Sequence, residues 1–171
     1  MNDILQNFNF IQTIRRNHAL EHATITILRR KGELGALGGI SGFKGFWLLG
    51  DIDPTTLQEA VDEAIQRLKA GEKHLAIQQQ CGANYAVPGM LAGFAAWLIM
   101  LMPGKKNWKT QFNRLTMVML AVTMVTIFAA PLGPVAQQLF LTDPDLGDMR
   151  VAGIMLYDRR GHQFQHVITQ Q

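Results

Sequence analysis

Cysteine and charged residues are the scarcest features of this sequence. The chain has one cysteine, Cys81, which excludes an intramolecular disulfide and leaves the redox compartment open. Charged residues make up 17% of the chain, whereas an average soluble domain has about 25%. Apolar residues make up 48%, so we expect apolar sequence to be concentrated in particular segments.

Two long segments lack charge altogether. Neither 74–104 nor 115–142 contains Lys, Arg, Asp or Glu. A helix needs roughly 20 mostly apolar residues to cross a bilayer, and both segments are long enough. We therefore predict membrane spans at about 86–102 and 115–141. The alternative is a pair of buried core helices in a soluble protein. This interpretation is weaker, because two such long segments follow one another.

The connection between the predicted spans is typical of a membrane hairpin. Residues 103–114 contain four basic side chains, no acidic one, and Trp108 where an interfacial anchor is expected. Pro131 and Pro134 interrupt the second apolar segment, and each removes a backbone donor. A kinked span and a helix that ends early fit these prolines equally well. The sequence thus predicts one transmembrane hairpin over residues 85–142.

An amino-terminal secretory signal is also missing. The first 16 residues have no basic start followed by a continuous apolar core and a cleavage site of small residues. Because two spans return the chain to its starting side, residues 1–84 and 143–171 are predicted to face one compartment. The basic connection favours a cytoplasmic position for the connection itself, and therefore an external one for the soluble part. Basic residues also flank the other ends of the spans, however, and oppose this bias. We expect a two-span protein of the cell (inner) membrane with a cytoplasmic soluble part.

The net charge of +3 resides in the connection, because segments 1–84 and 143–171 are nearly balanced. A basic loop at a bilayer attracts anionic headgroups, whereas binding to nucleic acid requires a basic face on the soluble part. The predicted partners are therefore the lipid bilayer and other membrane-protein subunits, and no nucleic acid.

The rest of the sequence predicts a small α/β soluble domain at 1–84. Apolar residues at helical spacing indicate a helix over 11–30, and Asp53 and Pro54 are typical of the N-cap and first position of a second helix that ends at Gly71. The stripe of the first helix consists of Ile11, Ile14, His18, Ile25 and Leu28.

Four strands complete the predicted fold. Two are expected at 37–43 and 46–52, and two at 151–157 and 162–169, the latter pair joined by a turn at 158–161. A two-stranded hairpin is marginal alone in water, so residues 143–171 are predicted to pack on residues 1–84. The expected fold class is an α+β membrane protein, with a transmembrane helical hairpin inserted in a small α/β soluble domain that has a C-terminal β-hairpin.

The run His18-Ala-Leu-Glu-His22 is an H-x-x-E-H motif inside the first predicted helix. Positions i and i+4 of a helix project from one face, so His18 and His22 can bind one metal ion, with zinc as the candidate. Glu21 stands between them as a possible catalytic general base. A hydrogen-bonded Glu–His cluster in the core is the alternative, because buried polar side chains need partners of some kind.

A metal site of this type needs a third protein ligand. Cys81 is our main candidate. The acids Glu59 and Glu63 are one turn apart on the second helix, where solvation and the helix dipole explain them better. His162 and His166 face one way on a strand, as residues of an exposed hairpin also would. The full set of candidates is Cys81, Asp51, Glu59, Glu63, His74, His162 and His166.

Three stretches within residues 10–100 carry a resemblance to a known family. They read RNHALEHATITILRRKG, GFWLLGDIDPTTLQEAVDEAIQRLKAGEKHLAI and CGANY. Together they resemble an uncharacterised family of bacterial membrane proteins with an amino-terminal His-Ala-x-Glu-His-Ala run and a Cys-Gly-x-Asn motif before the first transmembrane helix. A similar H-x-x-E-H run occurs in another membrane family of predicted metal-dependent enzymes.

The resemblance departs from the family at one potential ligand. The segment Gln78-Gln79-Gln80-Cys81-Gly82-Ala83-Asn84 is similar to a family segment that more often reads His-Pro-Asn-Cys-Gly-Thr-Asn. The resemblance therefore matches Cys81 and replaces a histidine by Gln78. It implies the layout of the chain and no particular reaction.

Two functional hypotheses follow. The first is an accessory or structural subunit of a larger membrane complex, with a metal site, whose hairpin packs against partner helices. The alternative is a membrane-embedded zinc-dependent hydrolase of the inverted-zincin type, in which Glu21 is the base for hydrolysis of an amide or ester.

Overall fold

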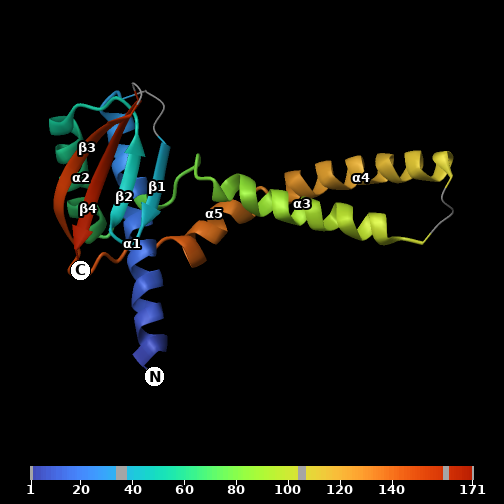
Figure 1. Cartoon of the computed structure of the whole chain (residues 1–171), viewed down its shortest axis with the longest axis horizontal. Coiled ribbons are helices and arrows are strands. Elements are labelled where there is room, and N and C mark those ends of the chain that lie inside the picture. The colour runs from blue at the N-terminus through green and yellow to red at the C-terminus, as the bar shows by residue number, and fades with distance from the viewer. Residues whose placement is uncertain (1, 34–37, 104–106, 160–161, 171) are drawn as a thin grey trace. The chain divides into compact units, whose positions relative to one another are not determined.

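Two compact units make up the structure, a computed structural model that describes residues 2–33, 38–103, 107–159 and 162–170 (Figure 1). The sheet unit comprises residues 1–78 and 138–171, and the helical unit comprises residues 79–137. The sheet unit contains α1 (Asn2–Arg30), β1 (Gly38–Gly42), β2 (Gly45–Leu49), α2 (Pro54–Lys69), the 3₁₀ helix η1 (Lys73–Ala76), β3 (Arg150–Arg159) and β4 (His162–Gln170). The helical unit contains α3 (Ala83–Leu101), α4 (Trp108–Ala129) and α5 (Leu132–Ala136), and the π-helix η2 (Gln137–Leu141) follows α5.

The four strands form one antiparallel sheet in the order β1-β2-β4-β3. The β3–β4 hairpin confirms the predicted C-terminal hairpin, and β4 pairs with β2, so that Phe46 lies opposite Val167. Close approach of these two strands requires glycine at position 45, because a Cβ there would overlap the carbonyl oxygen of Val167. Position 37 of the first predicted strand and positions 160–161 of the predicted turn lie outside the described residues.

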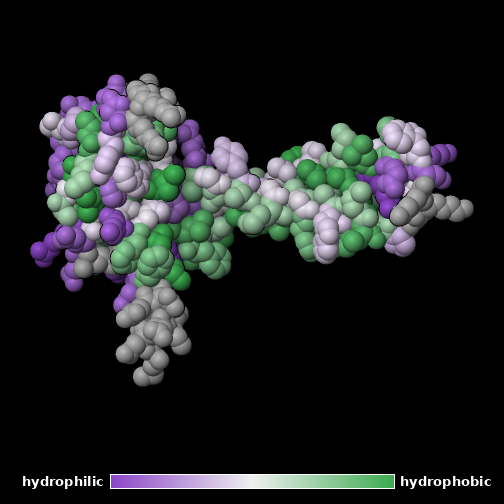
Figure 2. Space-filling view, in the orientation of Figure 1, coloured by the Kyte–Doolittle hydropathy of each residue, from purple (hydrophilic) through white to green (hydrophobic). Residues whose placement is uncertain are grey.

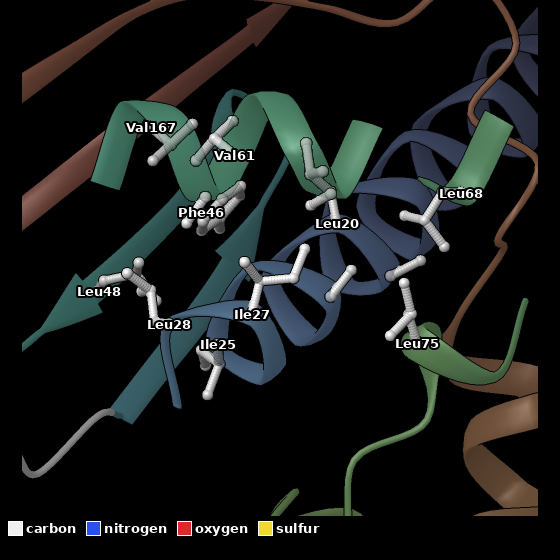
Figure 3. Close-up of a cluster of buried hydrophobic side chains, with 14 of the residues drawn as sticks. Leu20, Ile25, Ile27, Leu28, Phe46, Leu48, Val61, Leu68, Leu75 and Val167 are labelled. Carbon is white, nitrogen blue, oxygen red and sulfur yellow. The ribbon is translucent and has the colours of Figure 1, made fainter. Parts of the chain in front are cut away.

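One face of the sheet packs on helices and the other is exposed. Along β2 the side chains of Phe46 and Leu48 are buried, whereas those of Trp47 and Leu49 are exposed. This alternation is the period-2 pattern of an antiparallel sheet with one covered face. Figure 3 shows Phe46 beside Val61 of α2 and Val167 of β4 in the resulting core. Burial of this apolar face is what holds the two ends of the chain in one unit.

Helix α1 lies at the centre of the sheet unit and contacts β1, β2, α2 and η1. It is therefore buried on several sides, and Leu20, Ile27 and Leu28 are all at most 1% exposed. The predicted start near residue 11 was wrong, because the helix begins at Asn2, and residues 2–10 contain no proline or glycine to stop it. The predicted stripe was also wrong at its first member, since Ile11 is 56% exposed.

Helix α2 begins and ends as local sequence signals predict. The side chain of Asp53 accepts a hydrogen bond from the Thr56 backbone N–H at 2.9 Å, and Pro54 is the first helical residue. Gly71 follows the C-cap with a φ of 94°, a conformation that glycine adopts without steric cost. The predicted N-cap and terminating glycine are both confirmed.

In the helical unit, α3 and α4 pack along each other as a pair. Both helices are long and apolar enough to cross a membrane by length and composition, and most of their residues are exposed. Many of their large apolar side chains, among them Phe94, Trp97 and Phe128, are more than half exposed. Figure 2 shows this predominantly hydrophobic surface over α3 and α4.

The bounds of the second predicted span differ from those of the observed helices. Helix α4 begins at Trp108 because the side chain of Asn107 caps it, accepting from the Thr110 N–H at 2.8 Å. Much of the predicted loop is therefore helical. The helix ends at Ala129, and Pro131 separates it from α5, which contains Pro134, in agreement with the alternative of a helix that ends early.

Candidate metal centre

His18 and His22 lie one turn apart on α1, where the helical period places them on one face. Their ring centroids are 4.2 Å apart, and the ring planes are inclined by 60°. His22 is 1% exposed and His18 is half-buried. The motif thus brings the two imidazoles together on one face of α1, as the sequence predicts.

Each imidazole faces a backbone carbonyl through the same ring nitrogen. Nδ1 of His22 is 2.7 Å from the carbonyl oxygen of Ala76, and Nδ1 of His18 is 3.0 Å from that of Leu141. A carbonyl oxygen accepts but does not donate, so Nδ1 must carry the hydrogen in both rings. The lone pair of each neutral ring is therefore on Nε2. This is the arrangement of metal-ligating histidines, whose other N–H is donated to a carbonyl or carboxylate.

The two carbonyls come from segments that are themselves held in place. Ala76 is the last residue of η1, which packs on α1. Residues 139–143 run along α1, where the guanidinium of Arg15 donates to the carbonyl oxygens of Leu139 and Thr142 at 3.2 and 3.1 Å. The orientation of both rings therefore depends on tertiary contacts that reach far along the chain.

Burial keeps both histidines neutral. It lowers the pKa of His22 to about 4, with a smaller contribution from the nearby His18 and an opposing one from the Ala76 hydrogen bond. Burial also lowers the pKa of His18, against the effect of the Leu141 hydrogen bond. Neutral imidazole is the form that binds metal ions, so at pH 7 few protons compete for the two Nε2 atoms.

Glu21 points from α1 to β1. Its carboxylate accepts a hydrogen bond from the hydroxyl of Ser41, and a Cβ at Gly39 would overlap Oε1 of Glu21. The side chain is 4% exposed, and this burial raises its pKa to about 7, against a smaller opposing effect of Ser41. A carboxyl group with this pKa exchanges a proton at neutral pH, as a general base must.

The other acids and histidines considered as ligands have different surroundings. Glu59 forms an ion pair with Lys31 at 2.8 Å, and Glu63 forms one with Arg67 at 3.1 Å. Asp51 and His74 are exposed. None of these contacts involves His18 or His22 in the described part of the chain.

His166 of β4 lies away from α1. His166 stacks on Trp47 with ring centroids 4.1 Å apart, on the face of the sheet opposite Phe46 and Val167. The side chain of His162 lies outside the described residues.

Cys81 is a buried thiol that forms no disulfide, near the beginning of the helical unit. Its sulfur and the imidazole nitrogens of His18 and His22 are donor atoms of the kind that could hold a metal ion. Nitrogen and sulfur ligands of this kind suit zinc and several other transition metals.

Sequence reasoning missed three groups that shape this centre: the Ser41 hydroxyl and the carbonyls of Ala76 and Leu141. A serine in a glycine-rich strand can be suspected as a partner for a buried carboxyl. Backbone carbonyls, however, leave no mark in a sequence, because every residue has one.

Comparisons with known proteins place the chain in a family without assigning it an activity. The chain belongs to the family described as Domain of unknown function (DUF6391), which it matches over residues 13–154. It is similar to an uncharacterized protein of Picosynechococcus sp., with 38% identity over 110 residues, or 57% of this chain and 54% of that protein. The chain thus spans about half the length of this curated relative. No solved structure matches it.

Proposed function

We propose that this member of the DUF6391 family is a membrane-anchored metal-binding protein, in which Nε2 of His18 and Nε2 of His22 hold a transition metal ion such as zinc. The observation that carries the proposal is that both Nδ1 atoms face backbone carbonyls, which orients two neutral rings for coordination. In a hydrogen-bonded core cluster without a metal, the two histidines need not both carry their proton on Nδ1. When bound, the ion supplies Lewis acidity and, through its ligands, additional stability of the fold.

Cys81 is proposed as the third ligand. It follows Ala76, whose carbonyl orients His22, by only five positions, and such a length of chain reaches at most about 18 Å. The length of the connecting chain therefore permits the thiol to reach the two imidazoles. Coordination through its sulfur atom favours zinc over magnesium or calcium, which prefer oxygen ligands.

The helical unit is proposed to be the membrane anchor. Large apolar side chains cover the outside of α3 and α4, and a soluble protein rarely exposes such a surface. Lipid or the helices of partner subunits would cover it, and the role that we infer is a metal-carrying accessory subunit of a membrane complex.

A second candidate function is hydrolysis of an amide or ester, favoured by one specific observation. Burial brings the pKa of Glu21 to about 7 in the same turn of helix as both histidines. In this candidate function Glu21 removes a proton from the attacking water at neutral pH and later donates it to the leaving group.

Metal analysis of the purified protein tests the first proposal. We expect about one equivalent of a transition metal in protein extracted from membranes without chelators, and well under half as much after His22→Gln or Cys81→Ser, because each removes one of three ligands. Glutamine retains a donor towards the Ala76 carbonyl, so a folded variant is expected. His166→Ala is the matched control, since this ring lies on the far face of the sheet, and should keep the metal.

The same preparations separate the two candidate functions. The Glu21→Gln variant is expected to keep the metal whichever function is correct. If Glu21 is the general base, this variant no longer hydrolyses a peptide library that the unmodified protein cleaves. Unmodified protein that contains no transition metal would overturn the metal site and with it the hydrolase. Retention of a full equivalent by His22→Gln would place the ion elsewhere.

Cysteine labelling tests the membrane hairpin. In a Cys81→Ser background, single cysteines replacing Asp51 and Gln170 should react alike with a membrane-impermeant maleimide, and a cysteine replacing Asn107 should show the opposite accessibility. The reason is that two crossings return the chain to its starting side, with Asn107 on the other side between α3 and α4. With a cytoplasmic sheet unit, only Asn107→Cys is labelled in intact cells. Equal labelling at all three positions would contradict a membrane crossing.

A further inference from the structure

A small cavity lies in the sheet unit between residues 73–77, which include η1, and residues 138–144. Its volume is about 280 Å³, close to the lower end of the range for ligand pockets, so it suits a small ligand or one end of a larger one. Its walls are formed by Lys73, His74, Ala76, Ile77, Gln138, Thr142 and Pro144. All of these residues belong to the sheet unit.

The charged and polar walls of this cavity favour an anion. Lys73 supplies a positive charge, and His74 and Gln138 supply N–H donors, whereas none of the described residues that form the walls is acidic. Whether the cavity keeps a net positive charge therefore depends on whether acidic neighbours neutralise Lys73.

Three acidic residues adjoin wall residues in the chain, and each has a partner other than Lys73. Glu72 accepts from Arg67 at 2.7 and 2.9 Å, an arginine that it shares with Glu63, and its Oε2 is 4.0 Å from Nε2 of His74. Asp143 forms an ion pair with Arg16 at 3.7 Å, and Asp145 accepts from the backbone N–H of Gly147 at 3.2 Å. The positive charge of Lys73 therefore has no direct carboxylate partner among these three.

The same two wall segments orient the metal-binding pair. The carbonyl of Ala76, a wall residue, receives the Nδ1–H of His22, and the carbonyl of Leu141, adjacent to Thr142, receives that of His18. A ligand in the cavity would therefore contact the two segments that hold both imidazoles in place.

We propose that this cavity binds an oxyanion, a phosphate or carboxylate group, with Lys73 as the charged anchor and His74 and Gln138 as hydrogen-bond donors. The group is carried either by a soluble molecule or by a lipid headgroup. Binding of the oxyanion does not require the metal. Its role as the anchoring group of a substrate or effector of the metal centre rests on the function proposed above.

Titration with inorganic phosphate tests the cavity directly. The full chain is stripped of metal with a chelator and placed in phosphatidylcholine nanodiscs, and phosphate is added at constant ionic strength while backbone amide NMR shifts are followed. We expect saturable shifts in residues 73–77 and 138–144. Lys73→Gln should weaken binding about fivefold, the size of a partly exposed charge interaction, and Lys69→Gln, an exposed lysine at the end of α2, should leave it unchanged.

The arms of this experiment separate the possible sources and the possible failures. Shifts of the same amides in phosphatidylglycerol nanodiscs without added phosphate would identify a headgroup as the source, and shifts only with added phosphate would identify a soluble ligand. Absence of shifts in both arms, or equal weakening by Lys73→Gln and Lys69→Gln, would overturn the proposal. Because the protein is metal-free, these results stand whether or not the metal centre does.

Discussion

Replacing Phe46 by alanine is expected to lower the free energy of unfolding of the sheet unit by about 3–5 kcal/mol. Phe46 is fully buried on the central strand β2, between α1, α2 and the paired strand β4, so its removal leaves a cavity that rigid neighbours cannot fill. The total stability of a domain is about 5–15 kcal/mol, so this loss is a large fraction of it. Hydrogen exchange of the β2 and β4 amides in the full chain measures it.

Phe43→Ala is the matched control for this prediction. Phe43 is 50% exposed and stacks on Phe10 with ring centroids 5.1 Å apart. Its replacement by alanine should therefore lower the free energy of unfolding by about 1 kcal/mol at most. Equal effects of the two substitutions on exchange of β4 would mean that β2 and β4 do not share one core, and that the sheet order is wrong.

Replacing Glu21 by glutamine is expected to stabilise the metal-free protein by about 3 kcal/mol above pH 7 and to have little effect below pH 4.5. Burial raises the pKa of Glu21 from 4.5 to about 7 in the folded state. Ionisation therefore favours the unfolded chain, in which the carboxyl is solvated. Glutamine has the same shape and still accepts from Ser41, but it cannot ionise.

The pH course of this difference identifies its cause. The advantage of Glu21→Gln should grow as pH rises from 4.5 to 7 and then stay constant, because the native and unfolded carboxyls ionise over that interval. His22 titrates with the opposite sign, its stability contribution being lost as pH falls from 6.5 towards 4, but it is present in both proteins and cancels. Urea unfolding followed by circular dichroism at several pH values measures the difference. A difference that does not change with pH would show that Glu21 is not buried as the structure has it.

A bound metal would change this balance. A cation near the carboxylate stabilises its ionised form, so the advantage of Glu21→Gln should shrink in metal-loaded protein. Comparison of loaded and stripped protein at pH 8 thus reports on the distance between the metal and Glu21 without any assay of activity.

Local signals in the sequence were sufficient for several elements. Asp53 and Pro54 specify the start of α2 because a cap and a fixed φ act within one turn. The spacing of His18 and His22 specifies a shared helix face because the period of the helix does so wherever the helix lies. Two long uncharged segments likewise indicate two apolar helices, because composition alone determines how they are solvated.

Element bounds were less predictable where no such signal operates. The predicted helix began at residue 11, yet α1 extends through residues 2–10, since they contain no proline or glycine to break a helix that the core has already nucleated. Asn107 caps α4 eight residues before the apolar segment begins, in a stretch whose basic composition is typical of a loop.

Tertiary structure alone decided the sheet order and the chemistry of the candidate centre. The pairing of β4 with β2 joins residues more than a hundred positions apart, which no local pattern encodes. The sequence determined that two imidazoles share a face of α1. Which nitrogen carries the proton depends on the carbonyls of Ala76 and Leu141, and the pKa of Glu21 depends on burial against β1, because desolvation and hydrogen bonding arise only when distant segments pack together.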